Sequence, residues 1–409
     1  MEGVVKLTIG WARPTNVRQL IVTITVGAAH PTINRVLRHP LKGEGNNHRS
    51  IRIHRLPILG KPSHLQKPSP HRPARILVIR AGALGDTAYA SSIIEPLRHT
   101  YGEDAIIDWV AKAGIGKLFA QDPRIRQVFE LKSRRAPLPM NKGKLRIVSQ
   151  SWREPYDLIV NLELDSFFDT TLRLAQAKQK IGSPYQHFKE PAETHAVENL
   201  HIIYRSFLPA DALRYAYPKL LGTDAATIQK IFALNARYLV LVPSNSHFKS
   251  SPERNYRAWP IAHWKALIER LSTNDAQIVI IGGRNEAEYF ALLEPLPGNI
   301  RNLVGKTNFP ELIGLITGAA AVISTDTGPA HIAGAVNTPV YAIIGPTNFK
   351  RTGPYPTPDN EIHVLSANLP CSPCYHTQRF KDCPKNQCMY DVTPDQVIAA
   401  LRQNKVITG

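Results

Sequence analysis

The chain has 409 residues, which predicts two or three domains, and its hydrophobic fraction of 43% is sufficient for large cores. No apolar run approaches the roughly 20 residues that a membrane-spanning helix requires, and the run at 20–26 lacks the flanks of a secretory signal, so we expect neither. The net charge of +18 is compatible with nucleic acid, anionic lipid or phosphorylated substrates and does not choose among them.

Residues 1–73 differ from the rest of the chain in charge and composition. They hold 12 Lys/Arg and 2 Asp/Glu, a net charge of +10, together with many Pro and His residues. Because they show no sustained hydrophobic period, we expect a basic, disordered N-terminal extension. A membrane-surface tail, a nucleic-acid-binding tail and a translation start assigned too far upstream are all compatible with such a segment.

A regular alternation of strands and helices begins at residue 75. Helical segments, the first at 87–100, separate short apolar runs that predict buried strands at 75–80, 105–110, 127–131 and 156–162. This order of elements predicts a parallel sheet with helices on both faces.

The alternation stops between residues 208 and 234, which predicts a linker with one helix. It then resumes with strands at 238–242, 277–281, 320–324 and 339–344 and helices at 259–271, 286–293 and 329–335. We therefore predict an α/β protein with two tandem Rossmann-like domains, 74–222 and 223–409, facing a central cleft. Clefts between domains are preferred ligand sites.

The turn after the first predicted strand carries Gly82, Gly85 and Asp86. Glycines let the backbone come close to a ligand, and ligands of open α/β sheets bind where strands end. The spacing differs from G-x-G-x-x-G, so a dinucleotide fingerprint is not supported. Asp86 is either a helix N-cap or a carboxylate that faces the cleft.

A second turn, residues 324–331, follows the strand at 320–324 and leads directly into a helix. Helix N-termini offer free N–H groups and partial positive charge, so Thr327 and Gly328 form a natural diphosphate site. Asp326 is better suited to sugar hydroxyls, and His331 could reach a phosphate oxygen. The alternative is an ordinary capped helix with a core histidine.

Two further segments carry polar chemistry of their own. Ser244, Asn245 and Ser246 follow a predicted strand and could line the same cleft, and Arg257 could hold a diphosphate bidentately or be a solvated arginine. Near the C-terminus, Cys371, Cys374, Cys383 and Cys388 have the spacing of a tetrahedral structural zinc site, with disulfides or free thiols as alternatives. Their clustering does not suggest a secreted disulfide framework, so we expect a reducing, cytoplasmic setting.

These motifs, in this order, resemble glycosyltransferase family 9, the lipopolysaccharide heptosyltransferases. The resemblance covers residues 75 to about 401 and rests on Gly85-Asp86, the Pro243 loop with Trp259-Pro260, the Asp326-Thr327-Gly328 turn with His331, and the Cys-rich tail. It departs from the family at Arg257, where Lys is usual, and at residues 161–167, and residues 1–73 have no counterpart.

The resemblance implies the two-domain GT-B fold and inverting transfer of a heptose from ADP-heptose to a lipid A or inner-core acceptor. It implies that Asp86 is the general base and that the 326–328 turn binds the donor. No catalytic cofactor is expected, because the helix N-terminus, His331 and Arg257 stabilise the departing diphosphate without a divalent ion.

Other functions remain open from the sequence. A sugar-nucleotide epimerase of the same architecture, or a transferase that uses another nucleoside-diphosphate sugar, would carry similar turns. The expected partners are a nucleotide-sugar donor and a lipid-linked glycan acceptor, with peripheral contact at the inner face of the cytoplasmic membrane. Nucleic acid is not the expected partner, because the turns that carry chemistry all lie outside the basic segment.

Overall fold

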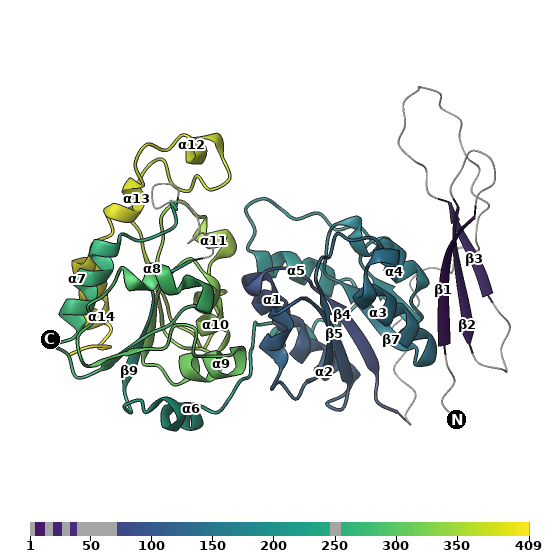
Figure 1. Cartoon of the computed structure of the whole chain (residues 1–409), viewed down its shortest axis with the longest axis horizontal. Helices are drawn as coiled ribbons and strands as arrows, with labels where there is room; N and C mark the ends of the chain where they lie inside the picture. The colour runs from purple at the N-terminus through teal and green to yellow at the C-terminus, as the bar shows by residue number, and fades with distance from the viewer. Residues whose placement is uncertain (1–4, 13–18, 27–32, 39–71, 246–254, 409) are drawn as a thin grey trace.

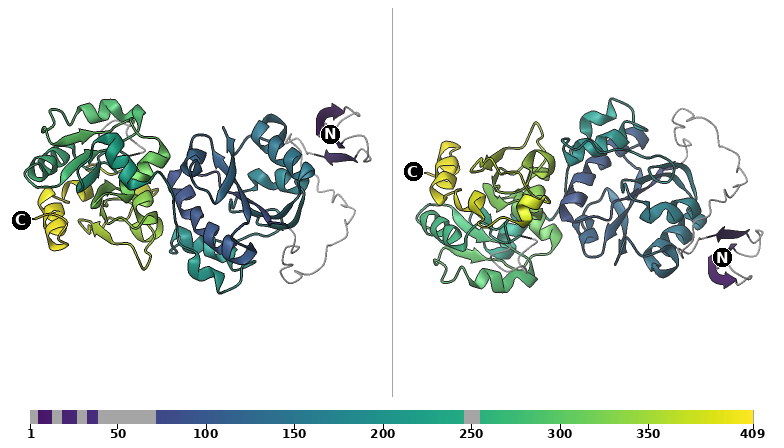
Figure 2. Two further views of the ribbon diagram at one scale, coloured as in Figure 1. Left: turned by 90° about the horizontal axis from the view of Figure 1, so that it is seen from below. Right: turned by 90° about the horizontal axis from the view of Figure 1, so that it is seen from above.

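The structure is a computed structural model that describes residues 5–12, 19–26, 33–38, 72–245 and 255–408. Two α/β units lie side by side along the long axis of the molecule, and the C-terminus lies in the second unit (Figures 1 and 2). Each unit is built on its own parallel sheet.

The first unit contains a five-stranded sheet in the order β6-β5-β4-β7-β8. Its strands are β4 (Arg75–Ile79), β5 (Ile106–Lys112), β6 (Ile125–Leu131), β7 (Tyr156–Asn161) and β8 (Ala177–Ile181). Its helices are α1 (Leu84–Ala90), α2 (Ile94–Tyr101), α3 (Lys142–Arg153), α4 (Asp169–Leu174) and α5 (Ala196–Tyr204). All strand pairs in this sheet are parallel.

The second unit contains a six-stranded parallel sheet in the order β11-β10-β9-β12-β13-β14. Its strands are β9 (Tyr238–Val242), β10 (Gln277–Ile280), β11 (Ile300–Asn302), β12 (Ala321–Thr325), β13 (Val340–Ile343) and β14 (Ile362–Leu365). Its longer helices are α6 (Ala225–Phe232), α7 (Ile261–Leu271), α9 (Phe309–Thr317), α10 (Gly328–Ala335) and α14 (Pro394–Gln403). The described residues of this unit also form the short helices α8 (Ala287–Ala291), α11 (Phe349–Thr352), α12 (Gln378–Lys381) and α13 (Gln387–Tyr390).

Both sheets have the same strand topology, which positions the site. In each, the first strand is central, the next two extend to one side and the later strands extend to the other. The direction of winding therefore reverses between β4 and β7 and again between β9 and β12. Ligands of doubly wound sheets bind outside the carboxyl ends of the strands at this reversal. The fold confirms the predicted α/β class and the two Rossmann-like units.

The central strands are apolar because helices cover both faces of each sheet. Every residue of β4, β9 and β12 is buried, and the predicted strands agree with the structure to within about two residues at each end. The predicted helix at 87–100 is corrected: α1 begins at Leu84, and a short 3-10 segment, Ser91–Ile93, separates it from α2. The proposed boundary after residue 222 stays a prediction and falls in the segment between the 3-10 helix Ala212–Tyr215 and α6.

Part of the N-terminal segment contains regular structure that was not expected. Strands β1 (Val5–Ala12), β2 (Gln19–Val26) and β3 (Ile33–Arg38) form an antiparallel sheet, which differs from the expected disorder. These stretches are rich in Val, Ile and Thr, which favour strands. The expectation of disorder rested on the Pro, His and Arg content of the whole segment. The rest of residues 1–71 lies outside the described residues.

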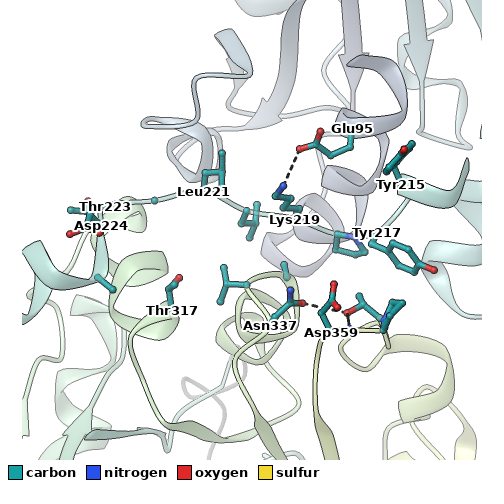
Figure 3. A pocket seen from close by; sticks show the side chains of 18 of the residues that line it. Glu95, Tyr215, Tyr217, Lys219, Leu221, Thr223, Asp224, Thr317, Asn337 and Asp359 are labelled. Atoms are coloured by element: carbon teal, nitrogen blue, oxygen red, sulfur yellow. Dashed lines mark hydrogen bonds and ion pairs between the residues drawn. The ribbon is translucent and has the colours of Figure 1, made fainter. Parts of the chain in front are cut away.

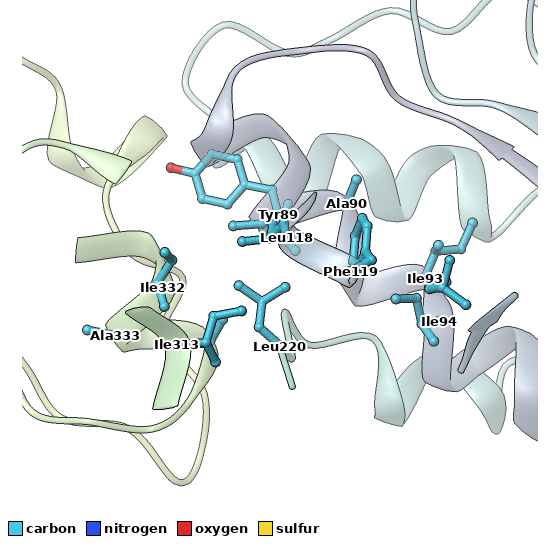
Figure 4. Close-up of a cluster of buried hydrophobic side chains, with 14 of the residues drawn as sticks. Tyr89, Ala90, Ile93, Ile94, Leu118, Phe119, Leu220, Ile313, Ile332 and Ala333 are labelled. Carbon is cyan, nitrogen blue, oxygen red and sulfur yellow. The ribbon is translucent and has the colours of Figure 1, made fainter. Parts of the chain in front are cut away.

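A buried apolar cluster joins the two units. Tyr89, Leu118 and Phe119 of the first unit, Leu220 of the connecting segment, and Ile313 and Ile332 of the second belong to one cluster (Figure 4). Helices α1 and α10, which each begin at the carboxyl end of a central strand, pack against each other. The units are therefore in contact at the base of the cleft.

Candidate active site

The turn after β4 and the turn after β12 meet across the cleft. A Cβ added to Gly85 would lie 2.8 Å from Cδ2 and 3.1 Å from Nε2 of His331, and one added to Gly328 would overlap the Leu84 side chain. Tyr89 of α1 places its ring 4.9 Å from the His331 ring, at a steep angle. The absence of a side chain at these two glycines thus lets the two turns touch.

A pocket of about 920 Å³ opens above this contact. Both units line it: Ala83, Leu84, Gly85, Asp86, Tyr89 and Lys117 come from the first, and the remaining lining includes Ser244, Arg257, Glu286, Asn308, Asp326, Thr327, Gly328, His331 and Tyr375. The structure therefore brings Asp86 and most of the predicted donor residues into one pocket. Asp86 lies on the wall formed by the first unit, and the donor residues lie on the wall formed by the second. Asn245 and Gly82 do not line it, and Ser246 lies outside the described residues.

Asp86 is the third residue of α1, and Ala83 occupies the N-cap position. Its Oδ2 accepts a hydrogen bond from the Ala83 amide at 2.8 Å, while its Oδ1 lies 3.0 Å from Nη2 of Arg80. The Asp86 side chain remains 40% exposed, so the carboxylate is held at the helix start and still faces solvent in the pocket. Gly82 permits this arrangement, because a Cβ there would lie 2.5 Å from Oδ2.

Arg80 fixes the Asp86 carboxylate from below. Its Nη1 donates to the Leu162 carbonyl at 2.9 Å, and burial opposes the charge of the guanidinium. Asp86 and Glu163 outweigh that desolvation and hold the pKa of Arg80 above its ordinary value. Glu163 also accepts from the Ala81 amide at 2.6 Å, which fixes the backbone of the turn.

Asp326 is nearly buried and is paired with Arg257. Its Oδ2 lies 3.0 Å from Arg257 Nη2, the same nitrogen donates to the Asp326 carbonyl, and the Asp326 side chain is only 9% exposed. The Nε of Arg257 is buried and has no hydrogen-bond partner among the described residues. The guanidinium is thus charge-paired on one side, and the residue also lines the pocket. Contact of Asp326 with sugar hydroxyls stays a prediction.

His331 is buried beneath the pocket in the first turn of α10. Burial lowers its pKa, and although Asp326 and Asp86 act in the opposite direction, Arg257 adds to the lowering. The ring is therefore neutral at pH 7, and its Nδ1 lacks a partner among the described residues. A neutral imidazole carries one N–H, so His331 can donate to an oxygen in the pocket without contributing a charge.

The N-terminus of α10 faces the pocket without a side-chain cap. Thr327 at the N-cap position has extended backbone, and its side chain caps no amide of the helix. Pro329 has no N–H and the Ala330 amide donates to the Thr327 carbonyl at 3.1 Å, so the Gly328 amide and the positive end of the helix dipole remain for a ligand in the pocket. An anion in this position would be stabilised by backbone alone.

Several lining residues were missed from the sequence. Glu286, Thr307, Asn308 and Phe309 follow β10 and β11, and the Glu286 carboxylate accepts from the Gly283 amide at 2.5 Å. The Gly282-Gly283 pair directly after a predicted strand was the available signal for this wall of the pocket. Lys117, in the 3-10 helix Ile115–Phe119, had no such signal.

The four cysteines are free thiols in the structure. In the described part of the chain, no group of three or more Cys, His, Asp or Glu side chains is arranged to hold a metal ion. Burial raises the pKa of Cys388 to about 11 and also raises the pKa of Cys374, in both cases with the other cysteines adding to the shift. Structural zinc at these positions stays a prediction.

A second pocket, of about 890 Å³, lies where the connecting segment passes between the units (Figure 3). Tyr217, Lys219 and Asp224 of that segment line it together with Glu95 and Asn337, and Lys219 is 3.4 Å from Glu95. None of the predicted site residues lines it. The convergence of Asp86, Arg257 and the α10 N-terminus therefore identifies the pocket above α1 and α10 as the candidate active site.

Comparison with known proteins shows the family of the chain. The family model of glycosyltransferase family 9 (heptosyltransferase) matches residues 173–384. The chain belongs to glycosyltransferase family 9. Lipopolysaccharide heptosyltransferase 1 of Escherichia coli O18:K1:H7 is 24% identical over 325 residues, which is 72% of this chain and 95% of the relative. The Pseudomonas aeruginosa protein of the same name is 24% identical over 353 residues, 81% of this chain and 94% of its own.

Solved structures of family 9 share the fold. The family 9 glycosyltransferase of Veillonella parvula superimposes with a TM-score of 0.66 at 16% identity and covers 81% of this chain and 96% of its own. ADP-heptose LPS heptosyltransferase II of E. coli gives 0.62 at 22% identity, with 80% and 98% covered. This family 9 glycosyltransferase thus has the predicted GT-B architecture. Among the helices that the structure describes, none has the length and hydropathy to cross a bilayer.

Proposed function

We propose that this glycosyltransferase transfers a heptose from ADP-heptose to an acceptor of the lipopolysaccharide core, with inversion at the anomeric carbon. The observation that carries the proposal is that an exposed carboxylate, Asp86, and an uncapped helix N-terminus, that of α10, line one pocket from opposite units. Related lipopolysaccharide heptosyltransferases, and structures of an E. coli heptosyltransferase with ADP and with ADP-2-deoxy-2-fluoro heptose, support the choice of donor.

In the proposed reaction the acceptor hydroxyl attacks the anomeric carbon on the face opposite the leaving diphosphate. The new glycosidic C–O bond forms as the bond from the anomeric carbon to the diphosphate oxygen breaks. Asp86 accepts the hydroxyl proton, within about 3 Å of the attacking oxygen. Arg80 Nη2 lies 3.0 Å from the other carboxylate oxygen and holds the side chain in place.

Negative charge develops on the departing diphosphate. In the proposed reaction this charge is stabilised by groups that line the pocket: the Gly328 amide and the dipole of α10, Arg257 and the N–H of His331. Since these groups supply the positive potential that a divalent ion would otherwise provide, we propose metal-independent catalysis. Full turnover in excess chelator would agree with this, whereas a requirement for Mg²⁺ would contradict it.

The proposed acceptor is lipid-linked, so we propose that the enzyme works at the inner face of the cytoplasmic membrane as a peripheral protein. A structural zinc ion at the four cysteines, all within residues 371–388, is proposed separately from catalysis. Elemental analysis of the purified chain would show one zinc per chain if that assignment holds and none if the cysteines are free thiols.

The donor is tested by calorimetry with ADP- and UDP-sugars in parallel. Selective binding of ADP-heptose is expected, followed by its consumption only when a heptose-acceptor glycolipid is present. Tight binding of UDP-sugars alone would overturn the choice of donor. A rearranged nucleotide sugar formed without any acceptor would instead favour an epimerase.

A further inference from the structure

Tyr375 belongs to the Cys-rich segment after β14 and lines the donor pocket. The guanidinium carbon of Arg257 lies 5.3 Å from the centre of the Tyr375 ring, within the range of a cation–π contact. The amides of Cys374 and Tyr375 both donate to the Pro346 carbonyl at 2.9 Å. This backbone contact ties the segment to the turn after β13, so the ring is presented from a fixed point.

The ring of Tyr375 is itself held by other aromatic rings. Phe380 meets it edge to face, with centres 5.0 Å apart and planes at 86°, and Tyr256 meets Phe380 at 5.3 Å and 90°. The Tyr256 hydroxyl donates to the Cys383 carbonyl at 3.0 Å. Tyr256, the first of the three rings, precedes Arg257 in the sequence, and Tyr375, the last, contacts the Arg257 guanidinium. The three rings therefore support one another and the arginine.

Arg257 therefore has two contacts that fix its direction. Asp326 holds Nη2, with the carboxylate at 3.0 Å, while Tyr375 lies against the guanidinium carbon. The buried Nε has no partner among the described residues. A long arginine side chain loses rotamer freedom when it binds a ligand, and a guanidinium that is already oriented loses less.

We propose that Tyr375 is a positioning residue for donor binding: its ring orients the Arg257 guanidinium toward the diphosphate. The inference rests on the proposed function, in which Arg257 binds that diphosphate. The proposal gives the Cys-rich segment a role in donor binding that is independent of whether its cysteines bind zinc. The aromatic face carries the effect, and the phenol hydroxyl does not.

The test measures the affinities of ADP and of adenosine for the full chain by calorimetry and competition. Tyr375→Leu should weaken ADP binding about tenfold and leave adenosine binding unchanged, because only ADP carries the diphosphate. Tyr375→Phe should stay within about twofold of the unmodified chain, since the ring face is kept. Tyr390→Leu, a change at an exposed tyrosine on α13 of the same segment, is the matched control and should have no effect on either ligand.

A double-mutant cycle separates positioning from folding. Arg257→Ala should weaken ADP binding, and adding Tyr375→Leu to Arg257→Ala should weaken it no further. Fully additive losses, or equal losses for ADP and adenosine, would overturn the role of Tyr375. If Arg257→Ala binds ADP normally, the diphosphate assignment in the proposed function fails instead, which the same cycle shows independently.

Discussion

Each unit has one aspartate–arginine pair at the carboxyl end of its sheet: both partners follow β4 in the first unit, whereas in the second Arg257 follows β9 and Asp326 follows β12. In the first unit Asp86 and Arg80 lie 3.0 Å apart, and in the second Asp326 and Arg257 lie 3.0 Å apart. The Asp86 side chain is 40% exposed and that of Asp326 is 9% exposed. The two pairs have the same separation, but the Asp86 carboxylate stays open to solvent, whereas that of Asp326 is largely buried beside its arginine.

Asp86→Asn removes the proposed proton acceptor at the solvent-exposed pair and should have the largest effect on turnover. We expect kcat to fall by roughly 10²- to 10⁴-fold, because an amide cannot take the hydroxyl proton. Donor affinity should stay close to that of the unmodified chain, and the loss of stability should be small because Glu163 still offsets the charge of the buried Arg80 guanidinium. Steady-state kinetics and calorimetry check both parts, and near-normal turnover would exclude Asp86 as the base.

Asp326→Asn makes the same chemical change at the largely buried pair, and its main effect should be on stability. It leaves the largely buried Arg257 guanidinium without its counter-charge, which should lower the free energy of unfolding by about 3 kcal/mol. Donor affinity should fall as well, because the orientation of Arg257 is lost. Denaturant unfolding compared directly with Asp86→Asn is the measurement, and equal stabilities of the two variants would remove the distinction between the pairs.

Gly85→Ala tests whether activity requires the close contact between the turn after β4 and the turn after β12. The added methyl group would lie 2.8 Å from the His331 ring, so the units should separate slightly, at a cost of about 1–3 kcal/mol that outweighs a gain in helix propensity of up to about 1 kcal/mol. We expect about a tenfold loss of kcat/KM. Gly298→Ala is the control, because a Cβ there meets nothing within 4 Å. Unchanged kcat/KM in Gly85→Ala would show that the contact is dispensable.

The sequence predicted the buried centre of both parallel sheets and one edge strand, β6, but it missed the other three edge strands. Strands such as Tyr238–Val242 are continuous apolar runs because both faces are covered. The missed strands β8, β11 and β14 are edge strands, and β8 has the polar sequence AKQKI with partly exposed residues. A short edge strand is defined by its pairing with a neighbour, which a local pattern does not contain.

The turns were predicted individually, but their partners were not. Asp86 and the 326–331 turn were both identified from their place after a strand and before a helix. That Arg257 pairs with Asp326, 69 residues later, depends on the spacing of β9 and β12 in the folded sheet. The position of Tyr375 under the Arg257 guanidinium could not be inferred, because the spacing of the neighbouring cysteines indicates metal binding and carries no signal for an aromatic contact.

The polar contacts between the units are made largely to main-chain atoms of the second unit. The Tyr89 hydroxyl donates to the Thr352 and Gly353 carbonyls, His195 Nε2 lies 3.0 Å from the Gly353 oxygen, and the Leu220 amide donates to the Ala335 carbonyl. Carbonyl oxygens are supplied by every amino acid. A changed side chain at residues 350–352 would therefore leave the contacts of Tyr89 and His195 in place, whereas Gly353 is restricted, because a Cβ there would lie 2.5 Å from the Phe349 ring.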